Sequence, residues 1–434
     1  MTETIKKSSE KTQLDFTAEG YQLTSAGVLP VDWCSRPLSA VAEKITQTAG
    51  FQEFETVSIS AGIGFVNQAE KFGKELSGKQ YEKYTVLHRG DFSYNKGNSK
   101  TYPQGCIYRL NDRMEAAVPN VFESFCIKDG NPDYYEQLFL SGFLNRQLYS
   151  RINHGVRDNG LLNLTGKDFF SCEVPCPPID EQRKIAEILV QFDKIITLYR
   201  CELEELKKLK TAYFELVFPR SGYKVPTLRF PGFDIPWKQR KLKDVTLKIG
   251  SGKTPLGGEK AYHLTGVPLI RSQNIINDRV DLADVVYIDS ATNEEMESSR
   301  VRYGDVLLNI TGASIGRSAV YKETVDANVN QHVCIIRPSA NVSPEFLQLH
   351  LSSYNGQKQI DFNQSRGGRQ GLNFQQIGKL EFLFPSEDEQ KCIGSFFESI
   401  NQLIFSNLRK LEEMQRMKKA VSRVLLTGIV RVNI

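Results

Sequence analysis

Three glycine-containing stretches of this 434-residue chain carry side chains that could recognise a ligand through hydrogen bonds. They are residues 91–104, 309–318 and 366–370, which are rich in lysine, arginine, asparagine, glutamine, serine and threonine. Lysine and arginine bind phosphates, whereas guanidinium, amide and hydroxyl groups match base edges, and glycine lets the backbone approach closely. This set suits DNA recognition. Solvated hairpin loops have a similar composition, so these residues alone leave both interpretations open.

Motifs for catalysis or cofactor binding are incomplete. Residues 250–254 (Gly-Ser-Gly-Lys-Thr) resemble a phosphate-binding loop, but Leu247 stands where the first glycine is required, and Pro255 disfavours the helix that should follow. Residues 131–134 resemble the Asn-Pro-Pro-Tyr loop of amino-methyltransferases, but Asp133 replaces the second proline. We therefore expect no catalytic residues in this chain.

Cysteine and histidine are also placed unfavourably for a metal site. The only close cysteine pair is Cys172 and Cys176, and no second pair lies near it. The five histidines form no pair at helical or hairpin spacing. We expect no metal, and reduced thiols rather than disulfides.

The composition is that of an ordinary globular protein with a net charge of +4. This charge is compatible with nucleic acid binding but does not require it. No run of about 18 apolar residues is present, and the start of the chain is polar rather than a secretory signal. We therefore expect a cytoplasmic protein.

The chain repeats itself with a period near 205 residues. The pattern Trp33-x2-Arg36-x-Leu38-x2-Val41-x2-Lys44-Ile45 recurs with identical spacing from Trp237 to Ile249. Each copy closes on a Leu-Asn pair, a proline and a Glu-Gln pair, which are Glu181-Gln182 and Glu389-Gln390. Between these anchors the copies differ. The pattern indicates two modules that share one scaffold and recognise different things.

A long helix is predicted after each Glu-Gln pair, because apolar residues follow it in alternating steps of three and four. A narrow seam of this kind is typical of a coiled coil, and Lys210 and Lys418 occupy equivalent slots in the two seams. The simplest interpretation is that the seams bury each other in antiparallel helices. The alternative is that each helix packs on its own domain. The predicted seam residues are Ile185, Leu189, Phe192, Ile196, Leu203, Leu206, Ile393, Phe397, Ile400, Ile404, Leu411 and Met414.

The two heads read as mixed α/β (α+β) domains, joined by the two long helices in a pseudo-twofold arrangement. Short helices are predicted over 132–148 and 344–359, each with proline in its first turn. The predicted domains are an N-terminal arm (1–30), a first head (31–178), a central helix (179–218), a linker (219–236), a second head (237–385) and a C-terminal helix (386–434).

Two different heads, each followed by a helix that opens with Pro-x3-Glu-Gln, resemble the specificity subunit of type I restriction-modification systems. The motifs that carry the resemblance are repeated in the same order, and they span residues 30 to 434. Further matches are Gly90 to Lys96, Thr227 to Trp237 and Gly304 to Asn309. The first 30 residues do not clearly repeat the leader of the second copy.

The resemblance implies a non-catalytic DNA reader. Each head would be a target recognition domain for one half of a bipartite, asymmetric sequence, and the helices would set the spacing. The helices would also dock two modification subunits, which bring S-adenosylmethionine and methylate adenine. Two restriction subunits would add ATP- and magnesium-dependent translocation and cleavage. No cofactor is expected in this chain itself.

The residues expected to contact DNA combine loop chemistry with their position in these motifs. Two other classes of function remain as alternatives: a stand-alone DNA methyltransferase or nuclease, and a coiled-coil scaffold with two protein-binding heads. The candidate DNA-binding residues are Tyr94, Asn95, Lys96, Thr311, Ser314, Arg317, Arg366 and Arg369.

Overall fold

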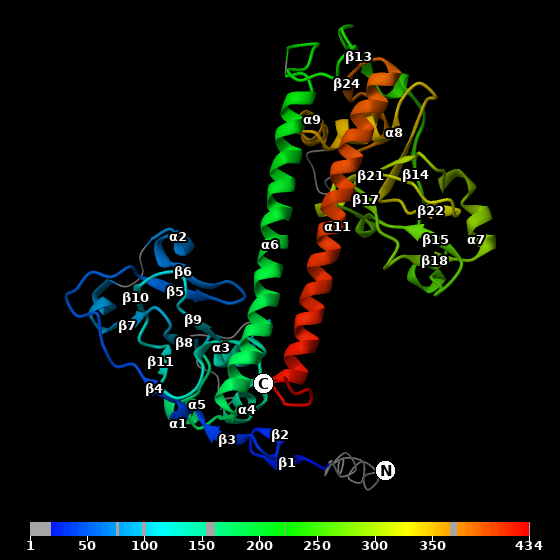
Figure 1. Cartoon of the computed structure of the whole chain (residues 1–434). Helices are drawn as coiled ribbons and strands as arrows, with labels where there is room; N and C mark the ends of the chain where they lie inside the picture. Colours follow the sequence, from blue (N-terminus) through cyan, green and yellow to red (C-terminus); the bar gives the residue numbers. More distant parts are fainter. Residues whose placement is uncertain are drawn as a thin grey trace. The chain divides into compact units, whose positions relative to one another are not determined.

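The computed structural model describes residues 19–74, 78–97, 101–152, 161–220, 222–364 and 371–433. It divides the chain into two compact units, of which the first comprises residues 1–199 and 410–434 and the second residues 200–409 (Figure 1). Both units mix helices and strands, as the sequence predicts. Within the described ranges, no helix has the length and apolar character needed to cross a bilayer.

The first unit is built around a sheet of strand order β4–β11–β8–β9, with strand pairs β3–β12, β1–β2, β5–β6 and β7–β10 beside it. Its strands are β1 (Tyr21–Thr24), β2 (Gly27–Pro30), β3 (Cys34–Pro37), β4 (Ala42–Lys44), β5 (Val57–Ser60), β6 (Gly64–Asn67), β7 (Thr85–His88), β8 (Phe92–Asn95), β9 (Cys106–Arg109), β10 (Glu115–Val118), β11 (Glu123–Ile127) and β12 (Glu173–Cys176). Its short helices are α1 (Leu38–Val41), α2 (Gln68–Phe72), α3 (Pro132–Leu140), α4 (Asn145–Arg151) and α5 (Gly166–Phe170).

The second unit contains a sheet of order β14–β23–β20–β21 and another of order β18–β15–β22–β19, in which β15 and β22 are parallel. The pairs β13–β24 and β16–β17 complete its described strands. The strands are β13 (Lys238–Lys241), β14 (Thr246–Ser251), β15 (Val267–Ile270), β16 (Ile275–Ile276), β17 (Arg279–Val280), β18 (Val286–Ile288), β19 (Arg300–Val301), β20 (Val306–Asn309), β21 (Ser318–Val320), β22 (Ala327–Val329), β23 (Val333–Pro338) and β24 (Glu381–Phe384). The short helices are α7 (Ser290–Glu295), α8 (Pro344–Ser352), α9 (Tyr354–Asn363) and α10 (Phe374–Gly378).

The repeat seen in the sequence is a repeat of topology. The order β4–β11–β8–β9 corresponds strand for strand to β14–β23–β20–β21, and the pair β3–β12 corresponds to β13–β24. The remaining parts differ, because the first unit adds the hairpin β5–β6 and the pair β7–β10, whereas the second adds the sheet containing β15 and β22. The two units therefore share a framework and differ in what is attached to it.

Each predicted short helix is two helices in the structure. The helix predicted over 132–148 ends at Leu140, because Gly142 adopts φ +77°, a conformation that interrupts a right-handed helix. The helix predicted over 344–359 ends at Ser352, and Ser353 leaves the helical conformation to cap α9 through Gly356 N. The sequence pattern continues through both breaks, so periodicity alone overestimates these helices.

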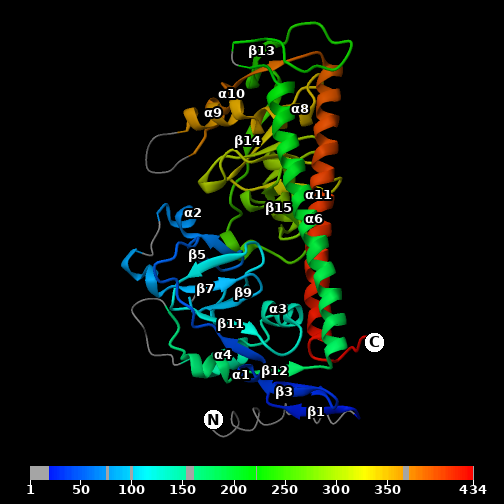
Figure 2. The same ribbon diagram turned by 60° about the vertical axis from the view of Figure 1, so that its left-hand side comes forward.

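The two long helices are α6 (Ile179–Val217) and α11 (Glu387–Leu425), each 39 residues long. The boundary between the units crosses both of them, so each unit contains one segment of α6 and one of α11. Within each unit these two segments lie side by side in both views (Figures 1 and 2). All twelve predicted seam residues are buried or half-buried.

Within each unit, the helix segments pack both on each other and on the head. In the first unit, Leu189 of α6 and Leu425 of α11 belong to one hydrophobic cluster together with Leu138 of α3. In the second unit, the rings of Phe214 and Phe397 lie 4.5 Å apart in the cluster that also contains residues of α8. Each long helix therefore buries its apolar residues partly against the other long helix and partly against the head of the same unit.

The two seam lysines are each neutralised by an aspartate. Lys418 Nζ lies 2.6 Å from Asp193 of α6, which also accepts a hydrogen bond from Gln137 of α3. Lys210 Nζ lies 2.6 Å from Asp278, in the turn between β16 and β17. A half-buried charge without a partner would be unfavourable, so each aspartate makes its lysine tolerable in the seam.

The repeated tryptophan and glutamate form one cluster in the first unit. Trp33 Nε1 donates to Glu181 at 2.9 Å, although 148 positions separate the residues. Arg431, in the segment after α11, donates to both oxygens of Glu181 at 2.6 and 2.7 Å and also pairs with Asp32. Glu181 is fully buried. The carboxylate thus joins the entry to the head, the start of α6 and the segment after α11.

The second unit repeats this cluster with different chain segments. Trp237 Nε1 donates to Glu389 at 3.4 Å, and Arg229 donates to both oxygens of Glu389 at 2.8 Å. Arg229 lies in the segment after α6, as Arg431 lies after α11. In both units, therefore, the arginine comes from the segment that follows one long helix, and the glutamate lies in the first turn of the other.

The repeated glutamine next to each glutamate fixes the start of the long helix to a short helix of the head. Gln182 accepts from Asn131 N at 2.8 Å and donates to Pro177 O at 2.9 Å. Gln390 accepts from Ser343 N and donates to Pro385 O, both at 3.1 Å. Asn131 and Ser343 are the N-caps of α3 and α8, so the repeated Pro-x3-Glu-Gln pattern has a structural role in both units.

The N-terminal hairpin β1–β2 contacts the segment after α11 within the first unit. Tyr21 Oη donates to Gly428 O at 3.1 Å. A Cβ atom on Gly428 would lie 2.4 Å from Pro30, and the glycine has φ +70°. Only glycine suits this close approach.

Removing the glutamate of the second cluster should destabilise the second unit. Glu389→Ala would leave the largely buried Arg229 and the indole N–H of Trp237 without their acceptor, and we expect the free energy of unfolding to fall by about 3–5 kcal/mol. Urea unfolding followed by tryptophan fluorescence measures this change. The matched control is Glu387→Ala in the same helical turn, where the side chain is 43% exposed and an effect below about 1 kcal/mol is expected. Equal effects of the two substitutions would contradict the role of the cluster.

Candidate nucleic-acid interface

The turn after β20 presents three of the predicted DNA-binding residues in the second unit. Thr311 Oγ1 lies 2.5 Å from His332 Nδ1, and Ser314 Oγ accepts from Asn309 Nδ2 at 3.1 Å. Arg317 is exposed, and its guanidinium has no ion pair within the described part of the chain. Gly316 has φ +87°, which lets the turn fold back to β21. The turn thus holds a threonine and a serine in place beside an available cation.

Hydrogen bonds link this turn, directly or through one intermediate residue, to three further segments. Asn309 Nδ2 also donates to Ser272 O, in the turn after β15, at 2.8 Å. Thr254 Oγ1 donates to Gln331 at 2.6 Å, and Gln331 in turn contacts His332. We call this linked set the polar rim and define it by the following residues: Thr254, Ser272, Thr311, Ser314, Arg317, Gln331 and His332.

Part of the rim was not predicted from the sequence. Four rim residues were not among the candidates: Thr254, Ser272, Gln331 and His332, of which the last two immediately precede β23. For Gln331 and His332, the signal that could have identified them is the three-residue polar run 330–332, which lies between the apolar residues of two strands. Their proximity to Thr311 depends on the pairing of β20 with β23.

Tyr94 is a core residue, so the prediction that it contacts DNA is wrong. Its ring is fully buried and stacks on Phe169 at 4.6 Å, and its hydroxyl donates to Gln104 O at 2.7 Å. Burial raises the pKa of this phenol well above its usual value. Both faces of β8 are covered, which the alternation of aromatic and polar residues in the sequence does not reveal.

Asn95 and Lys96 make internal contacts. Asn95 Oδ1 accepts from Gly97 N at 2.8 Å, and its Nδ2 donates to Ile59 O at 3.3 Å. Lys96 Nζ lies 2.7 Å from Glu123, which Lys44 also contacts at 3.0 Å. In this structure the two residues shape the end of β8 rather than presenting free polar groups.

The charge of Glu123 is maintained by these two lysines. Its burial raises the pKa, but the hydrogen bonds from Lys96 and Lys44 outweigh that effect, and the pKa lies below its ordinary value of 4.5. The group is therefore a carboxylate at neutral pH, paired on both sides.

Arg366 and Arg369 lie outside the described residues. The described chain resumes at Gly371, which forms an antiparallel bridge with Thr311, and Leu372 N donates to Ile310 O at 3.0 Å. In sequence, Arg369 is two positions from this bridge.

The glycine-rich stretch at 250–254 has a packing role. Residues up to Ser251 belong to β14, and no helix follows directly within the described residues. A Cβ atom on Gly252 would lie 1.5 Å from Val329 O, so this glycine lets two backbone segments meet. Gly252 is therefore explained by backbone packing.

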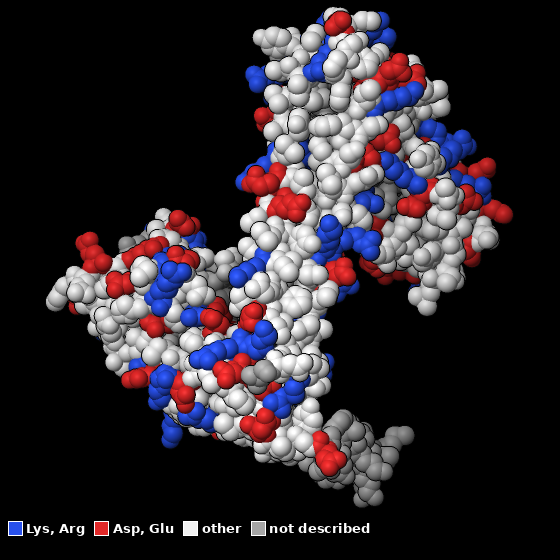
Figure 3. Space-filling model, in the orientation of Figure 1, with Lys and Arg blue, Asp and Glu red and all other residues white. Residues whose placement is uncertain are grey.

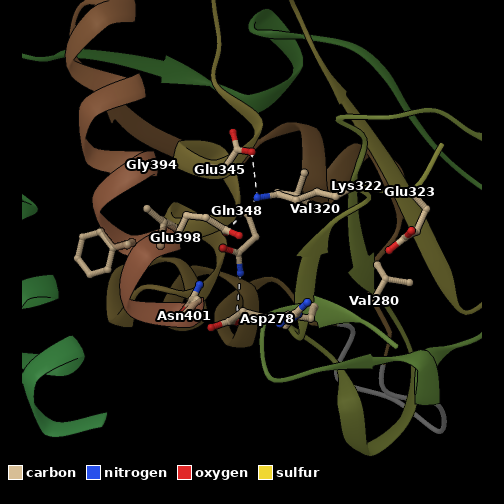
Figure 4. A pocket seen from close by; sticks show the side chains of 13 residues that line it. Asp278, Val280, Val320, Lys322, Glu323, Glu345, Gln348, Gly394, Glu398 and Asn401 are labelled. Atoms are coloured by element: carbon tan, nitrogen blue, oxygen red, sulfur yellow. Dashed lines mark hydrogen bonds and ion pairs between the residues drawn. The ribbon is translucent and has the colours of Figure 1, made fainter. Parts of the chain in front are cut away.

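A cavity of about 70 Å³ lies between α8, α11 and the β16–β17 hairpin of the second unit (Figure 4). Its charged groups pair with one another, since Lys322 Nζ lies 3.3 Å from Glu345 and 2.9 Å from Glu398. Asp278 accepts from Gln348 at 3.1 Å. These contacts fix the hairpin and α8 to the helix segment. Among the described residues there is no cluster of histidine, cysteine and carboxylate side chains that could hold a metal ion.

Basic and acidic side chains are interspersed on each unit, on the face shown in Figure 3. This distribution agrees with the net charge of +4. Recognition by such a surface depends on positioned hydrogen-bonding groups more than on a broad positive field.

Neutralising Glu123 should weaken the first unit in a pH-dependent manner. Because its folded pKa is lowered, its stabilising contribution is fully present above about pH 4.5 and is lost as the pH falls through the folded value. Glu123→Gln should therefore lower the free energy of unfolding by about 1–3 kcal/mol at pH 7, and by less at pH 3.5. Urea titrations at both pH values test this.

Glu53→Gln, at an exposed residue of the same unit, serves as the control and should have little effect at either pH. A penalty for Glu123→Gln that grows on acidification would contradict the pairing with Lys44 and Lys96.

Comparisons with known proteins agree on one family. The chain is 24% identical over 285 residues to the type I restriction enzyme MjaVIII specificity subunit of Methanocaldococcus jannaschii, covering 64% of this chain and 66% of that protein. It is 21% identical over 443 residues to the MjaIX specificity subunit of the same organism, covering 95% and 96%. It is also 21% identical to the EcoBI specificity subunit of Escherichia coli, over 85% of this chain and 80% of that one.

Two solved structures share the fold. The S subunit of a type I restriction-modification system from M. genitalium superposes with a TM-score of 0.60 at 13% identity, over 93% of this chain and 96% of that one. A chain from a study of complex assembly in the type I R-M system superposes with a TM-score of 0.51 at 16% identity, over 93% and 99%. The family model of the type I restriction modification DNA specificity domain matches residues 120–208 and 234–416. Because this match covers more than half of the chain, the protein belongs to that family.

Proposed function

We propose that this chain is the DNA-specificity subunit of a type I restriction-modification complex. Its family and the names of its relatives support this assignment. The structural observation that supports it is that the two units share a four-stranded sheet of the same order but carry different additional strands. The same sheet order and the same Trp–Glu–Arg cluster occur twice, whereas the parts attached to the sheets differ.

Each head would read one half of a bipartite, asymmetric target. Two identical DNA-binding heads would favour a symmetric target, because identical surfaces recognise identical half-sites. Here the second unit offers the polar rim, while the corresponding end of β8 in the first unit is closed by Asn95 and the Lys96–Glu123 pair. The different chemistry of the two ends supports two different half-sites.

The long helices would set the number of unread base pairs between the half-sites and dock the modification subunits. Large apolar side chains on their outer faces support a docking role, because such residues are unfavourable in water unless a partner covers them. Those that are exposed in the structure are Ile179, Ile195, Leu198, Leu209, Leu403, Phe405 and Met417.

Chemistry would come from the partners rather than from this chain. Two modification subunits would bind S-adenosylmethionine and methylate adenine, and two restriction subunits would use ATP and Mg²⁺. The incomplete glycine-rich and Asn-Pro motifs of the sequence support a non-catalytic role.

Arg317 should contribute to DNA affinity, because it is an exposed cation held on the polar rim. In the assembled complex, Arg317→Ala should weaken binding of the specific site by about 1–3 kcal/mol if the guanidinium contacts a guanine, and relax selectivity at that position. Fluorescence anisotropy with specific and substituted duplexes measures both effects. Arg240→Ala, an exposed arginine on β13, is the control and should leave selectivity unchanged. Unaltered affinity and selectivity for Arg317→Ala would remove this residue from the interface.

Lengthening α6 and α11 should change the number of unread base pairs between the two half-sites, but it should not change the half-site sequences. Four residues inserted after Leu206, with four at a matching level of α11, add about 6 Å of helix, or roughly two base-pair steps. We expect a longer unread gap, or loss of activity if the partners no longer fit. Sequencing of methylated sites in a host that expresses the complete system shows the result. A change in the half-site sequences themselves would contradict the ruler role.

A further inference from the structure

Gln331 is held at both ends of its side-chain amide by neighbouring residues of the polar rim. Its Oε1 accepts from Thr254 Oγ1 at 2.6 Å, and its Nε2 lies 3.1 Å from His332 Nε2. His332 is fixed on its other side, where Nδ1 lies 2.5 Å from Thr311 Oγ1. Gln331 is nevertheless exposed. A flexible polar side chain is therefore presented to solvent in one orientation, and little conformational entropy remains to be lost on binding.

The held amide keeps one donor and one acceptor. A glutamine amide has two N–H groups and two oxygen lone pairs. Thr254 uses one lone pair and His332 uses one N–H, so one N–H and one lone pair of this exposed side chain have no partner in those two contacts. Exchanging the amide oxygen and nitrogen, together with the other neutral tautomer of His332, satisfies the same neighbours and leaves the same two groups.

The remaining N–H donor and oxygen acceptor of the Gln331 amide complement the hydrogen-bonding groups of only some bases. Adenine presents N7 as an acceptor and N6 as a donor in the major groove, and a glutamine amide can bond to both at once. Guanine presents two acceptors there, which suit arginine instead. The donor and acceptor left on Gln331 therefore match the major-groove edge of adenine.

We propose that Gln331 is a specificity-determining residue that reads an adenine in the half-site of the second unit. Thr254 and His332 are positioning residues that hold its amide. The inference rests on the proposed function and adds to it the base that one residue selects. The turn of Thr311 and Arg317 joins the same surface through His332, so Gln331 lies among residues already expected to approach DNA.

The experiment compares methylated motifs in a host lacking other modification systems, each culture expressing the complete complex with one variant of this chain. With Gln331→Ala, one position in one half-site should become degenerate, and the wild-type base pair there should be A·T. Discrimination at that position should fall by about 10- to 100-fold. Gln331→Glu presents acceptors only, so it should shift the preference at the same position toward cytosine.

Two further variants separate reading from folding. Thr254→Val removes the hydroxyl that holds the amide and should relax the same position to a smaller degree, and Thr254→Ser should restore it. Gln402→Ala is the matched control, since Gln402 is an exposed glutamine on α11 that donates to Glu398 at 3.3 Å. It should leave every position of the motif unchanged.

The possible outcomes distinguish this inference from the proposed function. If the wild-type complex methylates no bipartite motif, the proposed function fails. If the wild-type motif is bipartite but Gln331→Ala preserves every position, or relaxes a G·C pair, the inference about Gln331 fails alone. Relaxation of one A·T position by both Gln331→Ala and Thr254→Val supports it.

Discussion

A glutamate buried in the first turn of each long helix makes the interaction on which both units depend. A carboxylate without solvent needs charged and hydrogen-bonding partners, and removal of one partner leaves an uncompensated charge. Glu181 and Glu389 each bind an indole N–H and an arginine. These partners come from chain segments that are far apart in the sequence, so one buried charge joins the start of a head, the start of one long helix and the segment that follows the other.

This arrangement explains how two heads can differ and still be held in the same way. The tryptophan, the Glu-Gln pair and the prolines repeat because they attach each head to the start of its long helix. Residues of the head that make none of these contacts are free to differ between the two units. In the second unit they form the polar rim, where Thr311 and Gln331 are ordered through His332. In the first unit the equivalent strand end is closed by the Lys96–Glu123 ion pair.

The long-range architecture was predictable because it depends on repetition and periodicity. The seams of α6 and α11, and the twofold occurrence of the tryptophan and Glu-Gln anchors, are visible in the sequence. The contact between Trp33 and Glu181 was not, since 148 positions separate them. The candidate site was less predictable. Tyr94 looks like a loop residue beside Asn95, but its strand is covered on both faces. Gln331 was missed because Thr254, which holds its amide, is 77 positions away in the sequence and lies beside it only through the pairing of β14 with β23.

The central claim is that one framework, used twice, carries two different readers. Sequencing of the methylated sites in a host that carries this chain with its modification and restriction subunits tests it most directly. We expect a single motif of two unlike specific parts, separated by a gap of fixed length and unspecified sequence. A continuous motif, or one with two identical halves, would contradict it.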